Sequence, residues 1–183
     1  MRIKYQEIDL VTVLVGLYGS QEAFIGEYQN MMAEKLMSAK QVDIDEEKRN
    51  LELLKMRFGE STLQTCNIIL KDVNDSKRQD TVVHNNAPPA LPRAPLNLRE
   101  LNTLAVSKGY WPINYDNPNS FQLPAPFKKV FEQYASSYAK IEAMRKIFFH
   151  YNLGHVNLSL NFENGDFEFK CTPIQAVLIS YFD

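Results

Sequence analysis

The sequence is poor in the side chains that build disulfide frameworks and metal sites. Its 183 residues include two cysteines and three histidines, too few for a disulfide framework or a His/Cys zinc set. Cys66 and Cys171 both lie on apolar stripes, so we interpret them as small core residues, which fits a reducing compartment. His150 and His155 flank a predicted turn without a carboxylate or thiolate nearby. We therefore expect no metal and no cofactor.

Motifs of catalysis are also missing. The chain has no phosphate-binding glycine loop and no nucleophile elbow, so we predict that it is not an enzyme in itself. Its formal net charge of −2 favours binding to neither nucleic acid nor anionic membranes. The apolar run Leu10–Leu17 is interrupted by Thr12 and Gly16 and is too short to span a bilayer. The weakly basic start, residues 1–4, lacks the pattern of a signal peptide.

Residues 8–79 show the apolar periodicity of helices. Ser20 is a predicted helix cap, and Asp43 with Glu46 resembles a capping box at the start of a second helix. Gly59 stands where that helix should end. The apolar stripes comprise Phe24, Ile25, Tyr28, Met32 and Leu36, then Ile44, Leu51, Leu54 and Phe58, then Leu63, Cys66, Leu70 and Val73. Short connections between such helices predict part of an antiparallel bundle, which we assign to residues 1–79.

Residues 80–97 differ from what precedes them. Four of the nine prolines lie here, at positions 88, 89, 92 and 95. Because proline blocks helix continuation and favours extended chain, we predict a mobile linker over 80–97.

Residues 98–183 predict a mixed α and β domain, so the whole chain is expected to be α+β. Pro124 and Pro126 open a helix whose apolar stripe ends at Ile141. The aromatic-rich segment 147–151 is a predicted strand.

A β-hairpin is the clearest local prediction. Apolar residues alternate with polar ones over 156–162 and again over 167–171, on either side of Asn164-Gly165. That dipeptide favours a type I′ turn. Such a turn pairs Phe162 with Phe167, Leu160 with Phe169 and Leu158 with Cys171, which places apolar side chains together.

The last predicted helix, residues 174–182, begins at a capping box formed by Thr172 and Gln175, with Pro173 in the first turn. It is apolar nearly all round. A helix of this kind is normally buried on several sides. We therefore expect further protein to cover it.

Two separated groups of residues resemble one family. The first runs from Asn50 to Ser61 and from Ile69 to Arg78; the second runs from Met144 to Ile147, through Leu153-Gly154, and from Thr172 to Ile179. Their order and spacing, over 9–79 and 107–183, are similar to the cullin-homology region of ubiquitin ligase scaffolds.

The resemblance implies a non-catalytic scaffold. It would bind a RING-finger subunit, which recruits the ubiquitin-conjugating enzyme, together with other ligase subunits, in ubiquitin-dependent degradation and cell-cycle control. In the family, the RING subunit adds a strand to the sheet of the α/β domain. The residues expected at this contact are Trp111, Ile147, Phe149, Val156, Leu158 and Leu160. The family continues into a winged-helix module after the point where this sequence stops, so the resemblance implies a fragment. It also implies a place in nucleus and cytoplasm.

Two other classes of function remain open from the residues alone. A hairpin next to a helix is also typical of winged-helix nucleic-acid binders, although the balanced charge disfavours phosphate contacts. A general protein-interaction domain is the other alternative.

Overall fold

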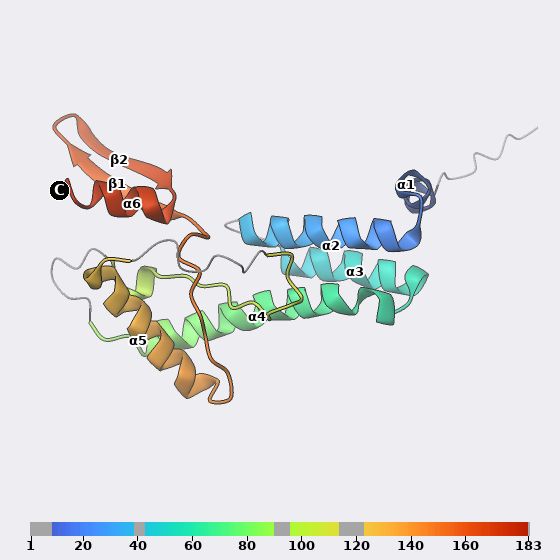
Figure 1. The fold of residues 1–183 in the computed structure, drawn as a ribbon, viewed down its shortest axis with the longest axis horizontal. Helices are drawn as coiled ribbons and strands as arrows, with labels where there is room; N and C mark the ends of the chain where they lie inside the picture. Colours follow the sequence, from blue (N-terminus) through green and yellow to red (C-terminus); the bar gives the residue numbers. More distant parts are fainter. Residues whose placement is uncertain (1–8, 39–42, 90–95, 114–122, 183) are drawn as a thin grey trace, which may run out of the picture. The chain divides into compact units, whose positions relative to one another are not determined.

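The computed structural model describes residues 9–38, 43–89, 96–113 and 123–182. Within these residues the fold is α+β, with six α-helices and one antiparallel pair of strands (Figure 1). Contacts divide the chain into two compact units, residues 1–71 with 106–112 and residues 72–105 with 113–183. The domain boundaries predicted from the sequence stay a prediction. In the described part, no helix is both long and apolar enough to cross a membrane.

Unit 1 contains α1 (Leu10–Tyr18), α2 (Gln21–Ser38), α3 (Ile44–Phe58), the 3-10 turn η1 (Ser61–Leu63) and the start of α4 (Gln64–Asn85). The predicted caps are confirmed. The Ala23 amide donates to Ser20 Oγ at 3.1 Å, and the amides of Asp45 and Glu46 donate to Asp43 Oδ1. Gly59 ends α3 with φ 89°.

The predicted apolar stripes form the core of unit 1. The buried residues include Phe24, Ile25, Met32, Leu36, Ile44, Leu51, Leu63, Cys66 and Leu70. Tyr18, Phe24 and Phe58 form a chain of ring contacts, with centroids 6.0 and 5.8 Å apart. α1 differs from the other helices because it buries none of its residues.

Unit 2 contains the rest of α4, the 3-10 turn η2 (Leu98–Glu100), α5 (Ala125–Ile141), β1 (Val156–Phe162), β2 (Gly165–Cys171) and α6 (Pro173–Ile179). Its principal core cluster is Val83, Ala87, Leu98, Val130, Tyr134 and Tyr138. The first residues of the segment predicted as a linker belong to α4, which continues to Asn85 and buries Asp80 and Val83. Residues 90–95 of the predicted linker lie outside the described residues.

The strand predicted over 147–151 is absent, since the described residues give this segment no strand partner. Its side chains nevertheless alternate. Phe149 and Tyr151 contact the ring of Phe131 on α5, at centroid distances of 4.9 and 5.1 Å, whereas Phe148 is exposed. The alternating pattern therefore reports packing on α5 rather than pairing in a sheet.

The hairpin is confirmed, but its predicted register is wrong by two residues. Phe162 pairs with Gly165, Leu160 with Phe167, and Leu158 with Phe169. The turn therefore consists of residues 163–164 rather than Asn164-Gly165. Gly165 has φ 125°, a conformation that glycine alone accepts readily, and it is the first residue of β2.

Candidate partner-binding surface

The hairpin has two chemically distinct faces. Because paired residues point to the same side of a sheet, the pairing collects all apolar side chains of both strands on one face. These are Val156, Leu158, Leu160, Phe162, Phe167, Phe169 and Cys171. The opposite face holds Asn157, Ser159, Asn161, Asp166, Glu168 and Lys170. The apolar face is the one suited to packing against protein.

Both long edges of this two-stranded sheet have no partner strand among the described residues. A two-residue turn makes the flanking pair, Phe162 and Gly165, hydrogen-bonded to each other. Such pairs alternate along an antiparallel ladder. The outward-facing backbone groups are therefore those of the polar residues, at 157, 159 and 161 on β1 and at 166, 168 and 170 on β2. These groups are available to an added strand.

α6 packs against β1 and begins with the predicted capping box. The Gln175 amide donates to Thr172 Oγ1 at 3.4 Å, and the Thr172 amide donates to Gln175 Oε1 at 2.9 Å. This reciprocal cap sets the angle at which the chain turns from β2 into the helix. The helix ends at Ile179, three residues earlier than predicted, because the last residues form tighter turns.

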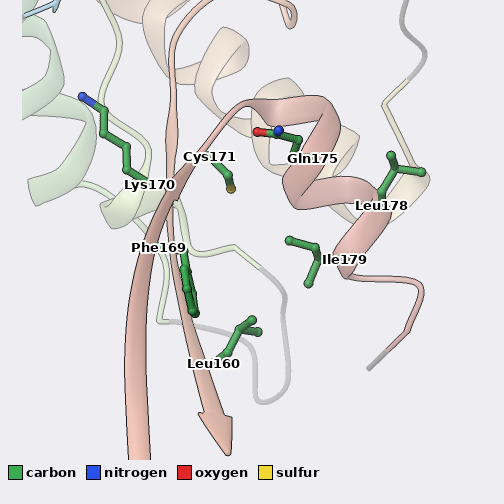
Figure 2. A pocket seen from close by; sticks show the side chains of 7 residues that line it. All are labelled: Leu160, Phe169, Lys170, Cys171, Gln175, Leu178 and Ile179. Atoms are coloured by element: carbon green, nitrogen blue, oxygen red, sulfur yellow. The ribbon is translucent and has the colours of Figure 1, made fainter.

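An open hollow of about 480 Å³ lies between α6 and the hairpin (Figure 2). Leu160 and Phe169 of the hairpin line it on one side, and Leu178 and Ile179 of α6 on the other. Lys170, Cys171 and Gln175 complete the lining. A hollow with mainly apolar walls and a polar end suits an apolar side chain of a protein partner better than a charged ligand.

Within the described residues α6 is covered only in part, and the expectation that further protein covers it stays a prediction. Only Ala176 and Val177 are buried, while Leu178 is 57% exposed and Phe182, just beyond the helix, is 90% exposed. The short length of α6 explains part of this exposure. Seven helical residues extend about 10 Å, whereas seven strand residues extend about 23 Å. The helix therefore covers less than half the length of the apolar face.

The residues predicted to bind a partner occupy three environments. Val156, Leu158 and Leu160 lie together on the apolar face of β1 and are half-buried. Ile147 and Phe149 pack against the core cluster of unit 2. Trp111 belongs to unit 1 and is 3% exposed, so its side chain is not accessible in this structure. All of the predicted residues except Trp111 are therefore only partly buried, and those of the hairpin lie together on one face.

Sequence reasoning missed the residues that complete this surface. Phe169, Leu178 and Ile179 line the hollow, and Phe162 and Phe167 form an exposed edge-to-face pair at the hairpin tip, with centroids 5.9 Å apart. The strand alternation contained the signal for Phe162, Phe167 and Phe169, because it places them on the apolar face, whereas no local pattern specifies the placement of α6.

The polar face does not favour a nucleic-acid wing. Its charged side chains are Asp166, Glu168 and Lys170, and Asp166 accepts a hydrogen bond from Asn161 Nδ2 at 2.6 Å. Phosphate binding requires a concentration of basic side chains. Across the part of the chain that the structure describes, no group of three or more His, Cys, Asp or Glu residues is placed to hold a metal ion.

Comparison with known proteins identifies the family. Residues 105–183 match the family described as the cullin alpha+beta domain. Over 182 residues the chain is 36% identical to anaphase-promoting complex subunit 2 of Arabidopsis thaliana, covering 98% of this chain and 21% of the relative. This chain is a homologue of the cullins.

Other relatives agree. The cullin homologue is 30% identical over 181 residues to human anaphase-promoting complex subunit 2, covering 98% of this chain and 21% of the relative. It is 26% identical over 176 residues to mouse Cullin-4A, covering 96% of this chain and 22% of the relative. The resemblance inferred from the two groups of residues is confirmed. The chain spans about a fifth of the length of these relatives.

Proposed function

We propose that this cullin homologue is part of the non-catalytic scaffold of a multi-subunit ubiquitin ligase of the anaphase-promoting type, acting in ubiquitin-dependent degradation and the cell cycle, in nucleus and cytoplasm. The observation that carries the proposal is its similarity, over nearly its whole length, to proteins named as anaphase-promoting complex subunit 2. Its direct partner is a RING-finger subunit, which in turn recruits the ubiquitin-conjugating enzyme.

The hairpin supports the mode of binding in this proposal. Strand addition needs backbone donors and acceptors at an accessible edge, together with an apolar face on which alternate side chains of the added strand pack. β1 and β2 offer both. The hollow beside Leu160 then receives an apolar side chain of the partner.

The first test is reconstitution. The purified chain is combined with ubiquitin, activating enzyme and conjugating enzyme, with and without a RING subunit. We expect ubiquitin chains only when the RING subunit is present, because the sequence shows no catalytic motif. Robust chain formation without the RING subunit would contradict the scaffold assignment.

The second test locates the contact with single prolines, since proline removes one backbone donor and fixes φ. At an outward position, Ser159→Pro for β1 or Glu168→Pro for β2, the hairpin ladder keeps its bonds while the edge loses a donor. Ser159→Ala and Glu168→Ala are the side-chain controls, and circular dichroism monitors folding.

We expect one of the two proline variants to lose RING pull-down while remaining folded, and its alanine control to retain it. Which variant fails identifies the receiving edge. If both folded proline variants bind normally, and substitutions in α2 or α3 abolish binding instead, strand addition at the hairpin is wrong and the helices of unit 1 hold the partner.

A further inference from the structure

An extended segment of unit 2, residues 101–105, is attached to α4 by side chains one helical turn apart. His84 Nε2 lies 2.9 Å from the Leu101 carbonyl oxygen. The Thr103 amide donates to Asp80 Oδ2 at 2.9 Å, and the Ala105 amide donates to Ser76 Oγ at 2.8 Å. We call these three contacts the ladder and the segment 101–105 the strap.

The spacing of the three contacts along the strap matches their spacing along α4. Successive rungs are two residues apart on the strap and four residues apart on α4. Two extended residues advance about 6.6 Å, and four helical residues about 6.0 Å. Three rungs can therefore form in succession without distorting either element.

Asp80 forms the central rung and is the most connected. Besides the Thr103 amide, its Oδ1 accepts from Thr103 Oγ1 at 2.8 Å and from the Tyr134 hydroxyl on α5 at 2.6 Å. Burial, with the hydrogen bond to Asp80, raises the pKa of Tyr134 far above its usual value, so this hydroxyl stays a donor. One buried carboxylate thus joins α4, the strap and α5, and all three of these partners are donors.

The strap's remaining amides are not held in this way. Leu101 and Ala105 pack against the core cluster of unit 2. For the amides of Asn102 and Leu104, the described part of the chain provides no acceptor. The strap therefore has the alternation of a strand, although side chains of a helix take the place of a neighbouring strand.

We propose that the ladder fixes the register of the strap on α4, with Asp80 as the key positioning residue, and we call this arrangement the lock. The strap opens and closes as one unit while α4 and α5 stay folded. The proposal is independent of the ligase function. It follows from the geometry that loss of one rung loosens all three, whereas the helices keep their own backbone hydrogen bonds.

The test is amide hydrogen exchange of the full chain, resolved by residue. Asp80→Ala removes both acceptor oxygens and with them all three bonds, and we expect Thr103 exchange to rise roughly ten- to hundredfold. Thr103→Val is the matched control, because it removes the hydroxyl and keeps the main-chain amide bonded to Asp80. The amide at position 103 of this control should exchange more slowly than in Asp80→Ala.

Ser76→Ala tests the cooperative opening without altering the carboxylate. It removes the acceptor of the Ala105 amide, and we expect faster exchange at both Ala105 and Thr103, with α5 unchanged. Faster exchange at Ala105 alone would show that the three contacts open independently, and it would overturn the proposal that the strap opens as one unit. Equal acceleration throughout α5 in either variant, or unchanged Thr103 exchange in Asp80→Ala, would overturn the lock.

Discussion

Gly165 gives the sharpest prediction about the hairpin. A Cβ added at this position meets no atom within 4 Å, so alanine fits the available space. The backbone is the obstacle, because φ is 125° and L-residues avoid this conformation. We expect Gly165→Ala to lower the free energy of unfolding by about 1–3 kcal/mol.

Gly16 provides the matched control for the same added methyl group. It lies inside α1 without a positive φ, and a Cβ there also meets no atom within 4 Å. Alanine in a helix interior is better than glycine by about 0.5–1 kcal/mol. Gly16→Ala should therefore stabilise unit 1, while Gly165→Ala destabilises the hairpin.

Thermal unfolding and amide exchange measure the two effects. A change of 1 kcal/mol shifts the midpoint by about 2–4 °C in a chain of this length. Faster exchange in Gly165→Ala should be confined to β1, β2 and α6 if the hairpin opens locally. If Gly165→Ala leaves both the midpoint and hairpin exchange unchanged, the positive φ, and with it the observed register, is wrong.

Three further outcomes are expected. Leu51→Ala should cost about 2–5 kcal/mol in urea unfolding because the side chain is 1% exposed, whereas Leu53→Ala, at 62% exposed, should change stability by less than about 0.5 kcal/mol. Burial raises the pKa of Cys66 to about 11, so in the folded chain it should react with a thiol reagent more slowly than the half-buried Cys171, and equal rates would contradict its burial. Hydrogen bonds from backbone amides, that of Glu46 first, lower the pKa of the Asp43 carboxyl. The stabilisation that Asp43 contributes is therefore present above the unfolded-state pKa and is lost as pH falls through the folded-state pKa. In a plot of unfolding free energy against pH, Asp43→Asn should make the decline at acid pH less steep.

The hairpin shows what a sequence pattern can and cannot determine. Alternation identified both strands and their apolar face, because that face must be removed from water. It did not distinguish the two registers, since Leu160 meets an apolar side chain in both, opposite Phe169 or opposite Phe167. The Asn164-Gly165 preference then favoured the wrong one, because glycine also suits a strand position with positive φ.

The end of α4 was missed for a different reason. Its buried face in unit 2 includes Ser76, Gln79, Asp80 and Val83, at helical spacing but mostly polar. A mostly polar face shows no periodicity of apolar residues in the sequence. Its polar side chains are buried only because the strap and α5 supply hydrogen-bond partners. Those partners lie more than twenty residues away in the chain. The hollow likewise depends on tertiary placement of α6, which no local pattern specifies.

The strict alternation of the hairpin constrains length changes within its strands more than length changes in its loop. Phe162 and Gly165 enclose two residues, but paired residues point to the same face whatever the number of residues between them. A residue inserted within β1 or β2 would instead move polar residues such as Asn161 or Asp166 onto the apolar face. Natural variation in length should therefore occur in the loop, and an insertion within a strand should be accompanied by a bulge that absorbs the extra residue.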